Sequence, residues 1–375
     1  MFIVQQKDLS QILHQLVGAL DTRNILPILS SYLIETDKGN GIVKVTSTNS
    51  KTSAIAEVDA VVESDIKFAV LGKELTNIVT NLPNQDVCIS INNEMVTVKC
   101  GASEFKLYTM DANRYPLFPE FNKDNMIKFA DKDIKEMIKT SRIACGEMIS
   151  KPLLSGVKWD FTDGVLTMVS MDGHRLSEVI LNSKYETNIG FSCVVPLNSV
   201  NFIEKTLQDN GSVSICVNDN KMVLFYDKIT IAAQLLGGKY PDYQGIMVDN
   251  NPIEKIIDRQ DLIKAIKRVS ILNNNDNVSL WLRFTKDTLS VFASNVELGE
   301  AQENIVVSSD ENDVETIYNN KSLLQILNTI QSKSIRLSLA KVEENGYSSA
   351  QSFVYPMPED ERYKTRMLLM PLRMR

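Results

Sequence analysis

The 375-residue chain lacks the features that would mark a membrane, secreted or metal-binding protein. No apolar run approaches the roughly 18 residues of a membrane-spanning helix, and the first eight residues lack the basic and apolar regions of a signal peptide. The five cysteines are scattered and never form a Cys-x-x-Cys pair, which argues against a disulfide framework or a zinc site and favours small buried side chains. The chain has only two histidines, His14 and His174, so a structural metal site is not expected. We therefore expect a cytoplasmic protein without metal or other cofactor.

Signatures of catalysis and of nucleotide binding are missing too. No G-x-S-x-G elbow surrounds any serine. Residues 237–239 read Gly-Gly-Lys but lack the upstream Gly and the following Ser or Thr of a Walker A loop, so ATP is not expected to bind. Asp172 and His174 resemble part of a hydrolase triad, but they sit in one tight run, which better suits a turn that shapes a pocket. The sequence predicts no catalytic residues and no enzyme activity.

What the chain does contain is an internal repeat of roughly 60 residues. Each copy has an Asp, Glu or Ser, then an apolar residue, then further apolar residues at helical spacing. The acidic or hydroxyl residue suits a helix N-cap or first turn, and the apolar spacing indicates one buried helical face. Six short helices are predicted, with first apolar residues at Leu9, Leu75, Ile134, Val200, Leu262 and Leu323.

Strands are predicted around each helix, and they define a larger period. Residues 87–91 and 95–98 alternate as a hairpin with Asn at the turn, and residues 214–217 and 222–225 repeat it. Tyr115-Pro116 aligns with Tyr240-Pro241, which gives a period of about 125 residues. We predict three similar α+β domains, each made of two helix-plus-strands half-repeats, at residues 1–123, 124–248 and 249–375.

The net charge is −7, which taken alone argues against a protein that grips nucleic acid. The positive charge is nevertheless concentrated on two predicted helices. A single basic stripe is typical of a solvated helix face, whereas stripes on equivalent helices favour one positive surface that contacts phosphates without reading bases. No aromatic residues interleave with the lysines, so base stacking is not expected. The predicted DNA-facing residues are Lys132, Lys135, Lys139, Arg142, Lys264, Lys267 and Arg268.

Four segments together resemble the bacterial DNA polymerase III beta subunit family, the DNA sliding clamps, and the resemblance covers the whole chain in order. They are Leu154-Ser155-Gly156-Val157, residues 171–176 (MDGHRL), residues 240–243 (YPDY) and the ending at residues 368–373 (LLMPLR). The resemblance implies the DNA-clamp fold, with helices lining the inner face and sheets outside. It implies a head-to-tail homodimeric ring that encircles double-stranded DNA and gives the replicative polymerase its processivity. The alternative is a β-rich repeat scaffold without a nucleic-acid role.

The resemblance also implies site residues. Arg23 matches a basic residue that family members place near the duplex. Four residues match the family's dimer contact: Phe105, Leu107, Ile271 and Leu272. The alternative is that these four are ordinary core or strand residues. The chain departs from the family pattern at Met171, where a Thr is frequent, and at Gly245, where an Arg is common; the missing Arg puts a polar contact to the peptide in doubt. A hydrophobic groove would receive short linear motifs of the polymerase catalytic subunit, the clamp loader, other polymerases and repair proteins, and it would comprise Leu154, Met171, Gly173, His174, Arg175, Leu176, Pro241, Ile246, Leu368, Leu369, Met370, Pro371, Leu372 and Arg373.

Overall fold

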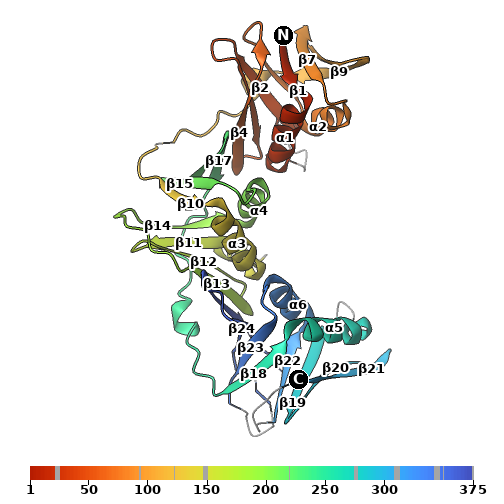
Figure 1. Ribbon diagram of the computed structural model, residues 1–375, viewed down its shortest axis with the longest axis vertical. Coiled ribbons are helices and arrows are strands. Elements are labelled where there is room, and N and C mark those ends of the chain that lie inside the picture. Colours follow the sequence, from red (N-terminus) through yellow and green to blue (C-terminus); the bar gives the residue numbers. More distant parts are fainter. Residues whose placement is uncertain are drawn as a thin grey trace. The chain divides into compact units, whose positions relative to one another are not determined.

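The computed structural model describes residues 1–21, 26–92, 94–121, 123–146, 151–218, 220–273, 278–307, 313–341, 347–348 and 350–373. Arg23, predicted to lie near DNA, is outside these residues. The chain forms two compact units (Figure 1). Unit 1 comprises Met1–Lys135 and Asn198–Leu235, and unit 2 comprises Glu136–Leu197 and Leu236–Arg375.

Each predicted copy of the repeat forms one α-helix within the described residues. The first apolar residue of every copy is at most 1% exposed, as the repeat predicts. The acidic residues of the repeat lie in the first turn of their helices and not at the N-cap, which was the other predicted position. The N-cap of α5 is the preceding Asp258, whose side chain accepts hydrogen bonds from two backbone N–H groups. The helices are α1 (Gln6–Leu16), α2 (Gly72–Asn81), α3 (Asp131–Ser141), α4 (Leu197–Thr206), α5 (Arg259–Val269) and α6 (Asn320–Thr329).

Short 3-10 helices mark the ends and connections of these elements. Pro27 and Pro152, which stand 125 residues apart in the sequence, both start such a helix, where a missing backbone N–H costs nothing. The 3-10 helices are η1 (Val17–Ala19), η2 (Pro27–Ser30), η3 (Ala112–Arg114), η4 (Arg142–Ala144), η5 (Pro152–Ser155), η6 (Gln244–Ile246) and η7 (Ser270–Leu272).

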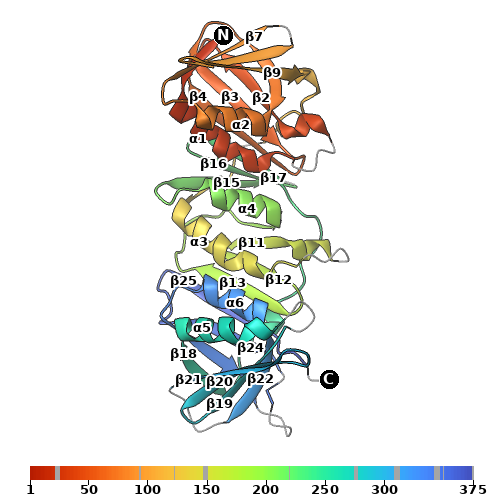
Figure 2. The same cartoon turned by 90° about the vertical axis from the view of Figure 1, so that its right-hand side faces the viewer.

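Unit 1 contains one antiparallel sheet with the strand order β10-β15-β16-β17-β4-β3-β2-β6-β9-β8-β7-β1-β5. Helices α1 and α2 lie side by side (Figure 2). The predicted hairpins form as β7–β8 and β15–β16. The strands are β1 (Phe2–Gln5), β2 (Ser31–Asp37), β3 (Ile42–Thr48), β4 (Thr52–Asp59), β5 (Val61–Val62), β6 (Lys67–Leu71), β7 (Asp86–Asn92), β8 (Met95–Cys100), β9 (Ser103–Met110), β10 (Ile127–Ala130), β15 (Ser212–Asn218), β16 (Lys221–Tyr226) and β17 (Ile229–Gln234).

Unit 2 contains two antiparallel sheets, ordered β14-β11-β12-β13-β25-β24-β23-β18 and β21-β20-β19-β22. Helices α5 and α6 lie side by side, and their apolar faces join the core formed by these strands (Figure 2). The strands are β11 (Gly156–Thr162), β12 (Val165–Met171), β13 (Arg175–Leu181), β14 (Phe191–Pro196), β18 (Ile253–Asp258), β19 (Ser279–Thr285), β20 (Thr288–Asn295), β21 (Gly299–Val306), β22 (Val314–Asn319), β23 (Ser334–Leu339), β24 (Ser352–Met357) and β25 (Tyr363–Leu369).

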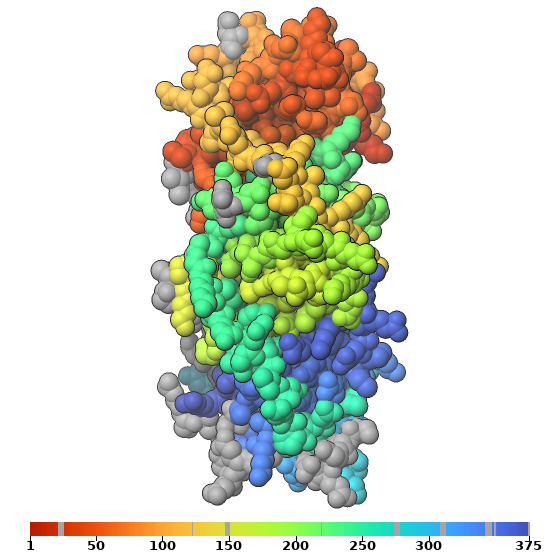
Figure 3. Space-filling view, turned by 90° about the vertical axis from the view of Figure 1, so that its left-hand side faces the viewer, coloured from red at the N-terminus to blue at the C-terminus, as the bar shows by residue number. Residues whose placement is uncertain are grey.

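The strand pairing runs across both predicted domain boundaries. In unit 1, β17 from the predicted middle domain pairs with β4 from the first. In unit 2, β13 from the predicted middle domain pairs with β25 from the third along its whole length. Because the sheets continue in this way, the two compact units divide residues 124–248 between them. In unit 2, residues 236–252 connect the predicted middle domain to the third, and this connecting segment runs in turquoise across the surface of the unit (Figure 3).

Candidate functional site

The pairing of β13 with β25 gathers most of the predicted groove residues in unit 2. Leu176 lies opposite Leu368, and Arg175 lies opposite Leu369. Beyond the end of β25, the backbone N–H of Met370 donates to the carbonyl of His174 at 2.8 Å. Two segments almost 200 residues apart in the chain therefore form one continuous edge of the site.

An apolar cluster forms the floor of this site. Leu154, Met171, Leu176 and Leu368 all belong to it, and each is at most 9% exposed. Aromatic and aliphatic side chains that were not predicted complete the cluster: Val169, Val194, Tyr240, Tyr243, Met247, Phe353 and Tyr355. Burial raises the pKa of Tyr243 to about 12, so its hydroxyl stays neutral at ordinary pH. The cluster thus offers an apolar base with neutral hydroxyl groups.

The rim of the site is more exposed than its floor. Ile246 and Met370 are 43% and 36% exposed, the accessibility needed to cover an inserted apolar side chain. Gly173, Pro241 and Arg373 are exposed, Leu372 is half-buried and Pro371 is buried. Leu369 lies elsewhere than predicted: it packs in the separate core formed with α5 and α6, because successive side chains of a strand point to opposite faces.

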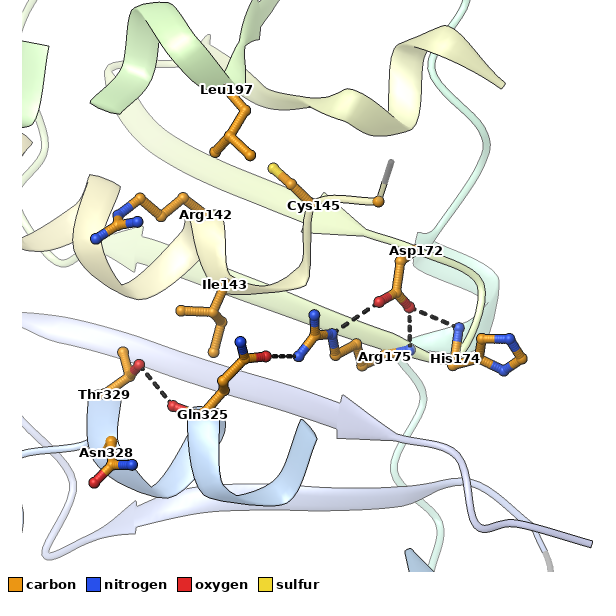
Figure 4. A pocket seen from close by; sticks show the side chains of 11 residues that line it. Arg142, Ile143, Cys145, Asp172, His174, Arg175, Leu197, Gln325, Asn328 and Thr329 are labelled. Carbon is orange, nitrogen blue, oxygen red and sulfur yellow. Dashed lines mark hydrogen bonds and ion pairs between the residues drawn. The ribbon is translucent and has the colours of Figure 1, made fainter. Parts of the chain in front are cut away.

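The turn between β12 and β13 is held by one carboxylate. Asp172 accepts from the backbone N–H groups of His174 and Arg175 and from the Arg175 Nε, at 2.9, 3.0 and 2.8 Å (Figure 4). Gly173 has a backbone φ of +92°, a conformation that residues with a Cβ rarely adopt. The His174 ring points away from the Asp172 carboxylate in Figure 4, so the two residues build a turn and form no catalytic pair.

One arginine ties the connecting segment to the sheet. Arg366 on β25 donates to the buried carboxylate of Glu178 on β13, with Nε 2.6 Å from Oε2. Its Nη1 donates to the Met247 carbonyl at 3.2 Å. Arg366 therefore fixes the segment that supplies Tyr243 and Met247 to the floor of the site.

A pocket of about 650 Å³ lies on the helical side of the same turn. Arg175 reaches across it and donates from Nη1 to the Gln325 Oε1 of α6 (Figure 4). Burial raises the pKa of the Cys145 thiol in this pocket to about 11. The lining residues are Arg142, Ile143, Cys145, Gly146, Asp172, His174, Arg175, Leu197, Gln325, Asn328 and Thr329. Of the predicted groove residues, only His174 and Arg175 line this pocket as well, so it is a separate hollow.

The predicted basic residues occupy the solvent-facing sides of their helices. Lys132, Lys264 and Lys267 are exposed, and Lys139 and Arg142 are half-buried. Several have carboxylate neighbours: Lys135 Nζ lies 2.8 Å from Asp209 Oδ2, Lys139 Nζ 3.8 Å from Glu136 Oε2, and Lys264 Nζ 3.7 Å from Asp261 Oδ1.

Arg268 makes a contact that its predicted role did not include. Its Nε donates to Glu303 Oε2 on β21 at 2.6 Å, and its Nη2 donates to the other carboxylate oxygen. The guanidinium is therefore directed at the outer strand of the four-stranded sheet.

Of the predicted dimer residues, Phe105 and Leu107 lie in the strand at one sheet edge, and Ile271 and Leu272 lie in η7 beside another. Strand β9 pairs with β8 over residues 103–108 and with β6 only at Thr109 and Met110, so residues 103–108 have no strand on their other side within the described chain. Phe105 is 40% exposed and Leu107 is half-buried. Strand β21 is the outer strand of its sheet, and the neighbouring Ile271 is 77% exposed with Leu272 half-buried beside it. An open edge of this kind is a site for pairing with another chain.

Three family models match the chain in order. They are the N-terminal, central and C-terminal domains of the DNA polymerase III beta subunit, over residues 1–119, 128–242 and 246–370. The chain belongs to the DNA polymerase III beta subunit family. It is a DNA sliding clamp of the replication machinery, an accessory subunit that is not itself catalytic, and the alternative of a repeat scaffold without a nucleic-acid role is not favoured.

Individual relatives agree with this assignment. The beta sliding clamp of Pseudomonas aeruginosa is 26% identical over 379 residues, and the match covers 100% of both chains. That of Bacillus subtilis is 24% identical over 383 residues, with 99% of each chain covered. The crystal structure of the Thermotoga maritima beta subunit matches the fold with a TM-score of 0.91 at 18% identity, covering 100% of both chains. The crystal structure of a Pseudomonas aeruginosa clamp bound to griselimycin matches with a TM-score of 0.90 at 24% identity, covering 100% of this chain and 99% of that chain.

Sequence reasoning about this clamp missed the aromatic part of the groove floor and its anchor. Tyr243 follows the repeated Tyr240-Pro241 pair by two residues, and Phe353 and Tyr355 alternate within one strand, so both patterns were visible. Arg366 offered no comparable signal, because its partner Glu178 is 188 residues away. Among the described residues no cluster of His, Cys, Asp or Glu suits a metal ion, and no helix is long and apolar enough to cross a membrane.

Proposed function

We propose that the chain encircles duplex DNA as a head-to-tail homodimeric ring, with clamp domains at residues 1–123, 124–248 and 249–375. The family assignment supports this proposal, as do six equivalent helices with one buried face each. Threading through a closed ring makes DNA binding long-lived even when each phosphate contact is weak. Because a replication clamp works on the chromosome, we place its action in the cytoplasm.

The two open sheet edges support the dimer. Strand β9 carries Phe105 and Leu107, and β21 lies beside Ile271 and Leu272. Pairing β9 of one protomer with β21 of its partner would satisfy the backbone groups of both edges and cover these apolar side chains. Head-to-tail pairing of unlike edges closes a ring when the rotation between protomers allows it.

The groove between β13, β25 and the connecting segment is the proposed docking site for partner motifs. A buried floor of leucines, methionines and aromatics suits an inserted Leu or Phe, and Met side chains adapt to different partners. The exposed rim at Ile246 and Met370 would cover such an anchor. The griselimycin-bound clamp of Pseudomonas aeruginosa shows that a relative of this fold holds a ligand, which supports a built site of this kind. We propose that the polymerase catalytic subunit, the clamp loader, other polymerases and repair proteins compete for it.

The decisive experiment is retention on DNA of different topology. Clamp loaded onto circular duplex should stay bound, and cutting the circle once should release it. Equal retention on circular and linear DNA would rule out encirclement. Ile271→Glu should convert the dimer to monomer in gel filtration because it places a charge in the covered edge, and Val296→Glu, at another exposed position beyond β20, serves as the matched control.

A further inference from the structure

The C-terminal residues that end the proposed groove also border the four-stranded sheet of unit 2. The backbone N–H of Leu372 donates to the carbonyl of Ile317 on β22, the outer strand of that sheet, at 2.7 Å. Two residues earlier, the N–H of Met370 donates to the carbonyl of His174 at 2.8 Å. Residues 370–372 therefore connect the groove directly to the edge of the four-stranded sheet.

An aromatic pair lies on the face of this sheet that is turned away from the core. Trp281 on β19 is directly opposite Ile317 on one side and Phe292 on the other, and opposed side chains share one face of a sheet. Leu280 and Leu282, the neighbours of Trp281 in its own strand, are 0% exposed and belong to the core formed with α5 and α6. Trp281 therefore points away from that core.

The side chains of Ile317, Trp281 and Phe292 form a row that we call the aromatic strip. The rings of Trp281 and Phe292 meet edge to face, with centroids 5.5 Å apart and 67° between their planes. Both residues are half-buried, so neither is closed off from solvent. The strip is thus an ordered apolar surface that starts next to the end of the groove.

Two arginines flank the aromatic strip. Arg283 lies two residues from Trp281 on the same face, and its Nε is 2.7 Å from Glu315 Oε2. The Arg283 side chain is 63% exposed and that of Glu315 only 13%, so this pair presents mainly its cation to solvent. Arg373, which follows Leu372, is exposed as well. A segment lying on the strip would therefore meet positive charge beside an apolar surface.

We propose that the aromatic strip extends the partner-docking groove, an inference that rests on the proposed function of that groove. A partner segment whose first apolar anchor occupies the groove places a second apolar residue, with a carboxylate beside it, on Trp281 and Phe292. The strand spacing separates Leu372 from Trp281 by about 10 Å, which three extended residues span. A short linear motif would contact the groove alone, whereas a longer segment would gain a second anchor.

The size of the strip favours a docked segment over a second copy of the chain. Two aromatic side chains offer at most about 500 Å² of contact area. A stable interface between proteins buries about 800 Å² on each partner. The strip therefore suits an accessory contact made by a segment that is already anchored nearby.

The two tryptophans of the chain allow a direct test by fluorine NMR. In clamp labelled with fluorotryptophan, Trp281 reports on the strip, and Trp159, which is 0% exposed, is the internal control. The probes are two synthetic peptides from the catalytic subunit of the replicative polymerase of the same cell. One is limited to the groove-binding motif, and the other is extended by about six residues at each end, more than the strip requires. We expect both peptides to bind, only the long peptide to shift the Trp281 resonance, and neither to shift that of Trp159.

Variants of the strip should weaken the long peptide selectively. Trp281→Thr keeps a residue that favours strands and should lower the affinity of the long peptide about five- to tenfold. Arg283→Gln should lower it about twofold at low salt and leave it unchanged at high salt, as expected for an exposed charge contact. Unchanged affinity for the short peptide shows in each case that the unit remains folded. Phe191→Thr, at a half-buried aromatic residue of the outer strand β14, is the matched control and should change neither affinity.

The outcomes separate this proposal from the groove itself. If the short peptide binds but the long peptide leaves the Trp281 resonance in place, or if either strip variant binds the long peptide as tightly as the parent, the strip proposal is wrong and the groove stands. A shift of Trp281 that depends on clamp concentration without peptide would overturn it in favour of self-association. Failure of both peptides to bind would overturn the proposed groove first.

Discussion

Arg366 gives the sharpest test of how the groove is held together. It lies opposite Glu178 in the β13–β25 pair, and the Glu178 side chain is only 4% exposed while that of Arg366 is 27% exposed. Arg366→Met keeps an unbranched apolar stem but removes the guanidinium and its charge. The variant leaves the Glu178 carboxylate buried without its main partner and removes the hydrogen bond to the Met247 carbonyl.

The expected cost follows from these contacts. Removing one partner of a buried ion pair costs about 3–5 kcal/mol. Water can reach the partly exposed position of Arg366, so we expect the lower end, about 3 kcal/mol, including about 1 kcal/mol for the Met247 bond. Changing Glu178 to Met as well removes the stranded charge, so the double variant should unfold within about 1 kcal/mol of the parent. Both variants should bind partner peptides more weakly, because the Tyr243–Met247 wall is no longer anchored.

Tryptophan fluorescence during urea unfolding measures this directly. Both tryptophans of the chain, Trp159 and Trp281, lie in unit 2, so the signal follows the unit that contains the pair. Lys364→Met, at an exposed position of the same strand, is the matched control. If Arg366→Met unfolds at the urea concentration of the parent, or if the double variant is as unstable as the single, the pair does not hold the groove.

Three further outcomes are expected. Burial acts to raise the pKa of Asp131, but hydrogen bonds, including three from backbone N–H groups, lower this pKa overall. The Asp131 carboxylate therefore stabilises the fold fully above its unfolded pKa near 4, and this stabilisation is lost as pH falls through the lower folded pKa. Asp131→Asn should accordingly lose less thermal stability than the parent between pH 7 and pH 3. Tyr318→Phe removes the buried bond to the Ser352 hydroxyl at 2.6 Å and should cost about 1 kcal/mol in thermal unfolding, with a larger loss pointing to repacking. Deleting residues from Met370 to Arg375 should abolish binding of a clamp-binding peptide and leave the dimer intact in gel filtration; unchanged peptide affinity would remove the ending from the groove.

The helices were predictable because their signal is local. Each copy of the repeat contains its own buried face, and residues such as Leu9 and Leu323 occupy that face as expected. The sheets were less predictable, because the pairing of β13 with β25 joins segments that belong to different copies. No periodicity within one copy specifies which strand of another copy it meets.

The groove was partly predictable for a related reason. Leu176 and Leu368 were identified through family resemblance, and the structure places them directly opposite each other. Leu369 could have been assigned to the other core from strand alternation alone. The contact of Arg268 with Glu303 spans 35 residues and two elements, so only the folded chain reveals it.

If helices α3 and α5 face the duplex as predicted, their ion pairs bear on how a clamp can hold DNA and still slide. Lys135, Lys139 and Lys264 each have a carboxylate within 4 Å, whereas Lys132 and Lys267 have none among the described residues. Exposed pairs of this kind are worth about 0–1 kcal/mol, so a lysine can exchange its carboxylate for a passing phosphate at almost no cost. The same carboxylates limit how strongly any one phosphate is held, because they stay nearby and repel its negative charge. A surface built from such exchangeable pairs favours many equivalent positions along the duplex over one tight position, and that near-equivalence is what sliding requires.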